Sequence, residues 1–273
     1  MDNFHDRLRL SWQQHNSLLC VGIDPVSDRL PRHLRDCGKP FFEFGKAIAD
    51  ATAPFVCAFK PQAAHFAAAA REAELGELIA YIKERHPLIP VILDAKRGDV
   101  GSTARLYAEE AFQRYNADAV TVSPYLGRDS LDPYLEYSDR GAVVLCRTSN
   151  PGSDWLQNNP EQSQPIYLQV AASVKAWDTR GQCMLVTGAT YPEELAKVRA
   201  IVGDMPLLVP GVGAQGGSVA EVLRNGLDTQ GQGLVISSSR AIIYADDSLD
   251  FADAAAAAAQ KTCEEINKYR FVS

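Results

Sequence analysis

Short runs of apolar residues alternate along almost the whole chain with stretches in which apolar and polar residues are mixed. Eight of the runs are rich in Val, Ile and Leu and nearly continuous, as is typical of parallel strands covered on both faces. They span residues 18–24, 55–60, 90–96, 118–124, 141–148, 182–189, 206–213 and 233–240. The pattern therefore predicts eight parallel strands.

Most stretches between these runs have the spacing of amphipathic helices or are rich in alanine. The predicted helices span residues 41–53, 72–86, 102–116, 192–202, 218–225 and 251–269, with a further helix in residues 1–16. Repeated strand–helix units favour an α/β fold, a (β/α)8 TIM barrel, over an open doubly wound sheet, because no GxGxxG motif follows the first strand. No linker rich in Pro, Gly or Ser interrupts the pattern, so we expect one domain over residues 1–273.

The composition excludes some classes of binding partner and indicates the cellular compartment. The 273 residues include 27 Lys and Arg against 34 Asp and Glu, and the net charge of −7 argues against nucleic-acid binding. No run approaches the ~20 apolar residues that span a membrane, and the N-terminal segment lacks the apolar core of a signal peptide. The six cysteines form no CxxC pair, and no His, Cys and Asp spacing suggests a metal site. We therefore expect a cytoplasmic protein with reduced thiols, no bound metal and no membrane contact.

Candidate catalytic residues gather where the predicted strands end, the part of a TIM barrel that carries its functional groups. The densest group lies in LDAKRGDVGSTA, residues 93–104. Asp94 and Lys96 are two residues apart on a strand predicted to be extended, so their side chains are expected to point to the same side. With Asp99 in the next loop and Lys60 at the end of the second strand, two positive charges meet two negative ones. A structural salt-bridge network is the alternative, but four charges at the strand ends of one barrel favour a catalytic role.

Two loops add to this picture. The glycine-rich segment VPGVGAQGG, residues 209–217, follows the seventh predicted strand, and Arg240 ends the eighth. Loops after these two strands commonly bind phosphate in TIM barrels, through backbone N–H groups and a guanidinium. The long polar segment 149–165, after the fifth strand, is typical of a lid that closes over a site, and a tolerated insertion without function is the alternative.

Together these motifs resemble those of the orotidine 5′-monophosphate decarboxylase family, in particular its longer bacterial branch. The segment DAKRGDVGSTA matches the family signature Asp-x-Lys-x-x-Asp, and matching motifs belong to strands 1, 2, 5, 7 and 8: GIDP, FKPQAAHF, TSNPG, VPGVGAQGG and SR. The resemblance implies decarboxylation of orotidine 5′-monophosphate to uridine 5′-monophosphate in pyrimidine biosynthesis, without a cofactor. It also implies a homodimer with shared active sites.

The resemblance further implies how the charged group works. Lys96 would donate a proton to C6 of the pyrimidine, and Lys60, Asp94 and Asp99 would complete the charged network around it. Asp99 and Thr103 would reach into the active site of the partner subunit.

The remaining implied residues bind parts of the substrate that do not react. These contacts would be Asp24 and Lys60 to the ribose hydroxyls, Thr148 or Ser149 to the pyrimidine, and Gln215, Arg240 and the backbone N–H of Ser239 to the phosphate. One position departs from the family, because many relatives have glycine where this chain has Ser239.

Two other functions remain as alternatives. Sugar-phosphate decarboxylases and aldolases of the same suprafamily share the Asp-x-Lys-x-x-Asp motif, but they typically carry an acidic metal ligand at the end of strand 2, where this chain has Lys60. A catalytically silent phosphate-binding barrel is the second alternative, and the intact charged group argues against it. An activity assay separates these possibilities.

Overall fold

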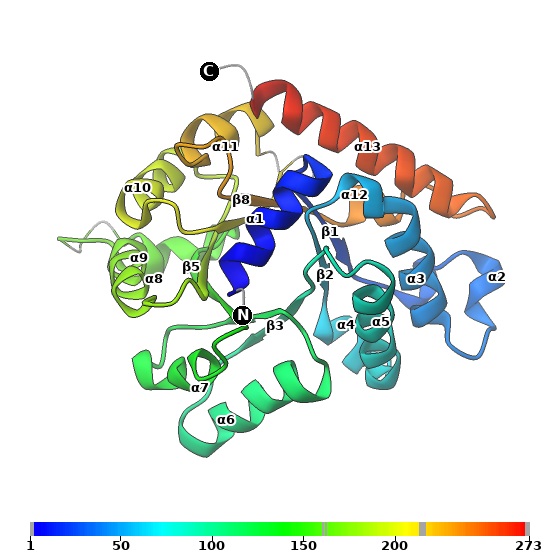
Figure 1. Ribbon diagram of the computed structural model, residues 1–273, viewed down its shortest axis with the longest axis horizontal. Coiled ribbons are helices and arrows are strands. Elements are labelled where there is room, and N and C mark those ends of the chain that lie inside the picture. The colour runs from blue at the N-terminus through cyan, green and yellow to red at the C-terminus, as the bar shows by residue number, and fades with distance from the viewer. Residues whose placement is uncertain (1–2, 160, 162, 213–216, 271–273) are drawn as a thin grey trace.

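Eight parallel strands form one sheet that curls into a nearly closed barrel (Figure 1). The structure, a computed structural model, describes residues 3–159, 161, 163–212 and 217–270. The strand order is β2-β1-β8-β7-β6-β5-β4-β3, and single bridges from Phe59 to Val91 and from Gln62 to Asp94 bring β2 and β3 together. The strands are β1 Leu19–Ile23, β2 Ala58–Pro61, β3 Ile92–Arg97, β4 Ala119–Val122, β5 Gly141–Arg147, β6 Cys183–Thr187, β7 Leu207–Pro210 and β8 Leu234–Ser238. The predicted (β/α)8 barrel is confirmed.

Helices surround the strands (Figure 1). They are α1 Phe4–His15, α2 Arg32–Arg35, α3 Pro40–Thr52, α4 Ala63–Ala68, α5 Glu72–Arg85, α6 Gly101–Glu109, α7 Asp132–Leu135, α8 Asp154–Gln157, α9 Ile166–Trp177, α10 Pro192–Val202, α11 Val219–Gly226, α12 Arg240–Ile243 and α13 Phe251–Arg270. The helix predicted over 102–116 is α6, and a π-helical turn, Glu110–Arg114, continues it. The sequence pattern did not predict α9, because Lys175 is the one charge among its 12 residues and no polar face marks it as a helix.

Helix α1 closes the end of the barrel at which the strands begin. The Phe4 ring packs against Gly141, the first residue of β5, so closely that a Cβ there would lie 2.4 Å from the ring. The His5 ring hydrogen-bonds to the carbonyl of Cys183, the first residue of β6. The ends of the strands, where the candidate catalytic residues lie, are therefore at the opposite opening.

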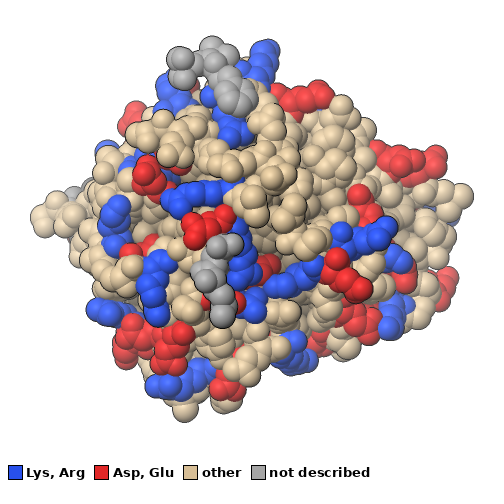
Figure 2. Space-filling view, viewed as in Figure 1, with Lys and Arg blue, Asp and Glu red and all other residues tan. Residues whose placement is uncertain are grey.

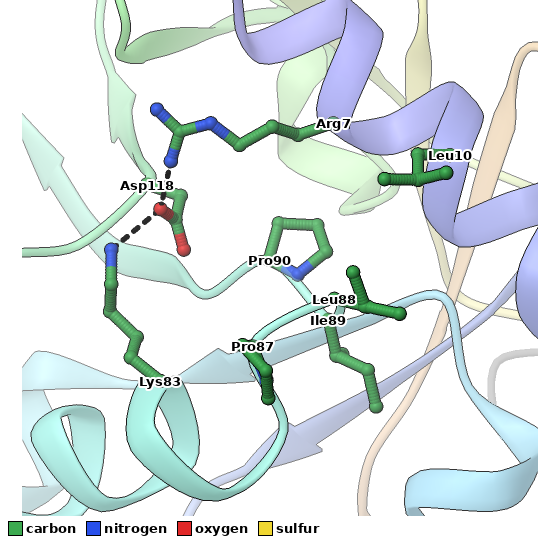
Figure 3. Close-up of a pocket in the computed structure, with 8 residues that line it drawn as sticks. All are labelled: Arg7, Leu10, Lys83, Pro87, Leu88, Ile89, Pro90 and Asp118. Carbon is green, nitrogen blue, oxygen red and sulfur yellow. Dashed lines mark hydrogen bonds and ion pairs between the residues drawn. The ribbon is translucent and has the colours of Figure 1, made fainter. Parts of the chain in front are cut away.

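A buried carboxylate just before β4 ties α1 and α5 to this closed end (Figure 3). Asp118 Oδ1 lies 2.5 Å from a guanidinium nitrogen of Arg7 and 2.6 Å from Nζ of Lys83. Its Oδ2 accepts the backbone N–H of Val91 at 2.9 Å. These side chains border a small cavity of about 110 Å³. Because both carboxylate oxygens are paired within the protein, this cluster has a structural role.

The surface on the α1 side carries both signs of charge. Lys and Arg side chains lie interspersed with Asp and Glu side chains over this face (Figure 2). Within the described ranges, no helix combines the length and the apolar character needed to cross a membrane.

Candidate active site

A buried aspartate holds two lysines at the strand ends of the barrel. Asp94, on β3, accepts a hydrogen bond from Nζ of Lys60 on β2 at 2.8 Å and another from Nζ of Lys96 at 2.7 Å, one carboxylate oxygen for each lysine. The side chains of Lys60 and Asp94 are each 8% exposed, whereas that of Lys96 is 51% exposed. Lys96 is therefore the charged group that faces open space at the mouth of the barrel.

Burial and neighbouring charges have opposite effects on the pKa values of Asp94 and Lys60. Burial on its own would raise the pKa of the Asp94 carboxyl, but the positive charges of Lys60 and Lys96 hold that pKa well below its usual range. Burial would likewise lower the pKa of Lys60, and the negative charges of Asp94 and Asp24 outweigh it, so the pKa of this lysine is raised. Asp94 and Lys60 are therefore both ionised at neutral pH.

Strand β3 is irregular where it carries these groups. Its pairing with β4 shifts register between Leu93 and Arg97. Lys96 adopts a φ of +46°, in the left-handed region that residues with a side chain rarely enter. The prediction of a regular extended strand from Asp94 to Lys96 is therefore wrong, although the two side chains do meet.

Thr121, on β4, belongs to this group but was not among the predicted site residues. Its side-chain oxygen accepts the backbone N–H groups of Ala95 at 3.0 Å and of Lys96 at 2.9 Å. Its hydroxyl proton is donated to Asp94 Oδ1, 2.9 Å away. A signal was present in the sequence, because Thr121 is the one polar residue in the apolar segment AVTV.

The structure of one chain brings together three of the four predicted charges. Among the residues that the structure describes, no ion pair within 4.0 Å joins Asp99 to Lys60 or Lys96. Asp99 Oδ1 instead accepts the backbone N–H of Val100 at 2.8 Å. Thr103 is exposed on the first turn of α6. Of this predicted cross-subunit pair, Asp99 is therefore half-buried in the loop after β3, and Thr103 is exposed on α6.

A cavity of about 170 Å³ adjoins the charged group. It lies at the ends of β1, β2, β7 and β8, and its lining includes Asp24, Lys60, Gly211, Ser239 and Arg240. Arg240 is exposed and is the first residue of α12. Strand β8 ends at Ser238, so the prediction that Arg240 ends the eighth strand is wrong by two residues. The predicted phosphate ligand Gln215 lies outside the described residues.

Asp24 presents an unused acceptor beside this cavity. Its Oδ1 is buried and has no hydrogen-bond partner among the described residues. Its other oxygen, Oδ2, accepts the hydroxyl proton of Ser239. A buried carboxylate oxygen without a donor is costly in a folded protein, so a donor from a bound molecule would stabilise it.

Ser239 fits its position without the conformational freedom of glycine. Its φ is −128°, outside the left-handed region that favours glycine. Its side chain packs against the backbone of Gly22, where a Cβ would lie only 2.9 Å from that of Ser239. In this chain the close contact is accommodated by a glycine on β1, and the hydroxyl orients Asp24.

The loop after β5 gives Thr148 and Ser149 different surroundings. The Thr148 hydroxyl donates to Asn150 at 2.7 Å and accepts from the side-chain amide of Gln157 at 3.0 Å. The backbone N–H of Thr148 donates to the side-chain oxygen Oε1 of Gln157, at 2.8 Å. The Ser149 hydroxyl makes no hydrogen bond to any described residue, while its backbone packs tightly against Gly188.

Comparison with known sequences identifies the family. The sequence model of the "Orotidine 5'-phosphate decarboxylase / HUMPS family" matches residues 17–255. The chain belongs to this family. An orotidine 5'-phosphate decarboxylase from Ralstonia nicotianae is 56% identical over 268 residues, which cover 98% of this chain and 99% of that protein. One from Cellvibrio japonicus is 52% identical over 271 residues, with 98% and 99% covered. The chain is thus an enzyme of the orotidine 5'-phosphate decarboxylase family, a group of carboxy-lyases.

Solved structures of the family share the fold. An OMP decarboxylase from Leishmania donovani is 38% identical, with a TM-score of 0.85 and complete coverage of both chains. A UMP synthase from the same organism is 40% identical, with a TM-score of 0.88, and the match covers 100% of this chain but 57% of that one. In the UMP synthase the matching barrel is therefore one part of a longer protein.

This family member also contains a buried cation that the sequence interpretation missed. Arg147, the last residue of β5, is 0% exposed. Its guanidinium donates to Ser153, Asp154 and Glu194, and it lies 3.8 Å from the centre of the Tyr191 ring. These contacts fasten the loop after β5 to α10. The available signal was a charged residue at the end of an otherwise apolar strand.

The described residues include no group of three or more His, Cys, Asp or Glu side chains placed to hold a metal ion. At the end of β2, the side chain that contacts Asp94 belongs to Lys60. A cation at this position would repel a metal ion from the Asp94 carboxylate.

Proposed function

We propose that this enzyme decarboxylates orotidine 5′-monophosphate to uridine 5′-monophosphate in pyrimidine biosynthesis, without a metal or organic cofactor. The observation that carries the proposal is the ion-paired group in which Asp94 holds buried Lys60 and open Lys96 at the mouth of the barrel. Family membership supports it, and so do relatives that carry this name at more than half identity.

The proposed reaction requires stabilisation of a carbanion. When the bond from C6 to the carboxylate breaks, its electron pair stays on C6 in the plane of the ring, where no adjacent group accepts it. An ammonium group at that point stabilises the developing charge, and then transfers a proton to C6. Lys96 would supply both, since its Nζ is the exposed end of the ion-paired group.

Asp94 and Lys60 would prepare the site for this step. Asp94 fixes the position of Nζ of Lys96, which donates a hydrogen bond to it at 2.7 Å. Lys60 keeps Asp94 ionised although the carboxylate is buried. The negative charge of Asp94 would lie beside the departing carboxylate of the substrate, which favours its loss as neutral CO₂.

The rest of the substrate would bind along the cavity next to this group. The free Oδ1 of Asp24 would accept a hydrogen bond from one ribose hydroxyl, and Nζ of Lys60 would donate one to a ribose hydroxyl. We assign Ser149 to the pyrimidine, because the Thr148 hydroxyl is already engaged within the loop. The phosphate would bind Arg240, the backbone N–H of Ser239 and Gln215. Binding energy from the phosphate would drive closure of loops 149–165 and 211–217 over the site.

The enzyme would act as a homodimer in which Asp99 and Thr103 complete the site of the partner subunit. Exposed apolar side chains near these residues support the interface: Leu106 on α6 is 63% exposed, and Tyr125, after β4, is 75% exposed. The proposed location is the cytoplasm, and the unpaired cysteines, of which five are buried, support a reducing compartment.

Purified protein in the presence of a chelator is expected to consume orotidine 5′-monophosphate, because lysine charges replace a metal in the proposed mechanism. The loss of substrate absorbance measures the reaction, and uridine 5′-monophosphate is identified as the product. Activity that disappears with chelator and returns with magnesium would instead place the enzyme with the sugar-phosphate decarboxylases and aldolases. A protein that binds the nucleotide without converting it would be a silent phosphate-binding barrel.

The substitution Arg240→Ala is expected to weaken binding of uridine 5′-monophosphate by about tenfold to a hundredfold, because a charge-assisted hydrogen bond contributes about 1.5–3 kcal/mol. Binding of uridine, which has no phosphate, should change little. Calorimetric titration of both ligands measures the difference. Arg224→Ala is a matched control, since Arg224 is an exposed arginine on α11 that pairs with Glu221. Equal weakening of both ligands by Arg240→Ala would show that Arg240 has a structural role instead.

A further inference from the structure

The Thr121 side chain makes three hydrogen bonds, all of them to the segment that carries the charged group. We propose that Thr121 is a positioning residue: its hydroxyl fixes the backbone of Lys96 and the carboxylate of Asp94 in the arrangement that proton transfer requires. The inference rests on the proposed function for its catalytic consequence. Thr121 is 1% exposed, so it acts through its neighbours and does not touch the substrate itself.

The geometry of β3 shows why a hydroxyl is needed here. In a regular strand, consecutive N–H groups point to opposite sides, so a single atom cannot accept both. Here the N–H groups of Ala95 and Lys96 converge on one oxygen, at 3.0 and 2.9 Å. This is possible because Lys96 has a φ of +46° and the pairing of β3 with β4 is out of register at this point. Thr121 thereby satisfies two N–H groups that the irregular strand cannot pair with a neighbouring strand in the usual way.

The Thr121 hydroxyl makes every hydrogen bond that a hydroxyl can make. It has one proton to donate and two lone pairs with which to accept. Because the two N–H groups occupy both lone pairs, the proton is directed at Asp94 Oδ1, 2.9 Å away. The same Oδ1 accepts Nζ of Lys96 at 2.7 Å. One side chain therefore holds Lys96 at two points, through its backbone N–H and through the carboxylate that its ammonium contacts.

The substitution Thr121→Val keeps the shape and removes the hydroxyl. We expect kcat to fall by about tenfold to a hundredfold, because a displaced catalytic group loses alignment with the reacting carbon. KM should stay within about threefold, since the ribose and phosphate contacts lie elsewhere. Thr121→Ser, which keeps the hydroxyl, should restore kcat to within about threefold of the wild type. Thr52→Val is the matched control, because Thr52 is a buried threonine whose hydroxyl bonds to the Ile48 carbonyl within α3.

A second pair of variants and a second measurement guard against loss of folding. Thr121→Ser and Thr121→Ala differ by one oxygen atom, and both are smaller than threonine. Amide hydrogen exchange of Ala95 and Lys96 should be faster in the Ala variant than in the Ser variant, while exchange of other strand amides stays equal. This readout uses the ligand-free protein, so it tests the fixing of the Lys96 backbone even if the chain fails to decarboxylate the nucleotide.

Three results would overturn the inference. The first is a kcat for Thr121→Val within about threefold of the wild type. The second is an equal loss of kcat in the Val and Ser variants, which would indicate packing and not hydrogen bonding. The third is equal exchange at Ala95 and Lys96 in the Ser and Ala variants. Inactive wild-type protein, combined with the expected exchange difference, would reject the proposed function while supporting the structural part of the inference.

Discussion

The substitution Lys96→Ala is expected to reduce decarboxylation of orotidine 5′-monophosphate by at least about 10⁴-fold. The side chain would act twice, as the charge that stabilises the carbanion and as the proton donor, and each role contributes about 10²-fold or more. Its Nζ is held 2.7 Å from Asp94 at the open side of the group, and no other described lysine contacts Asp94 from that side. The loss of substrate absorbance measures the rate, and titration with uridine 5′-monophosphate shows whether the variant still binds nucleotide.

A lysine at the other end of the barrel provides the matched control. Lys83 also pairs with a buried aspartate, Asp118, at 2.6 Å, and this aspartate keeps Arg7 as a partner when Lys83 is removed. Lys83→Ala should therefore leave the rate close to that of the wild type. If Lys96→Ala kept more than about a hundredth of the wild-type rate, the proton would have to come from another group, and the assignment of Lys96 would be wrong.

The barrel was predictable because most strand residues are buried on both faces, so the strands form nearly continuous apolar runs. Strands β1, β4 and β6 are buried along their whole length. The same reasoning fails where an element has no contrast between its faces, as in α9. It also fails for the irregularity in β3, because the Lys96 backbone at a φ of +46° donates its N–H to the Thr121 hydroxyl on the neighbouring strand, and no pattern in the sequence marks that contact.

The site was predictable to the extent that its groups lie at strand ends. Lys60, Asp94 and Lys96 come together as expected, because parallel strands in a barrel end at the same opening. Thr121 and Arg147 were missed for a different reason: they act on the backbone or on a loop, and neither belongs to a charge pattern in the sequence. A polar residue in an apolar strand marks each of them in the sequence, but their partners are 25 or more residues away for Thr121 and up to 47 away for Arg147, so tertiary structure was needed to identify those partners.

The position of Asp99 calls for a test of the shared site. Its carboxylate makes no ion pair with Lys60 or Lys96 of its own chain, among the residues that the structure describes. We expect Asp99→Ala to be nearly inactive, like Lys96→Ala, if Asp99 supports the lysine of the partner subunit. Each variant alone then forms dimers in which every site carries a lesion.

Mixing the two inactive variants is expected to restore about one quarter of the wild-type activity. Random exchange makes about half of the dimers mixed, and in a mixed dimer one site combines both lesions while the other has neither, if the sites are independent. Activity is measured after subunit exchange, and differently tagged subunits show by co-purification that exchange has occurred. The matched control mixes Lys96→Ala with Lys60→Ala: both residues serve a site in their own chain, so every site keeps a lesion and no activity should return. If Lys96 and Asp99 served the site of the same chain, the mixture of Lys96→Ala with Asp99→Ala would stay inactive, like this control. Inactivity despite proven exchange would therefore reject the cross-subunit role of Asp99. The proposed decarboxylase reaction would be unaffected by that result.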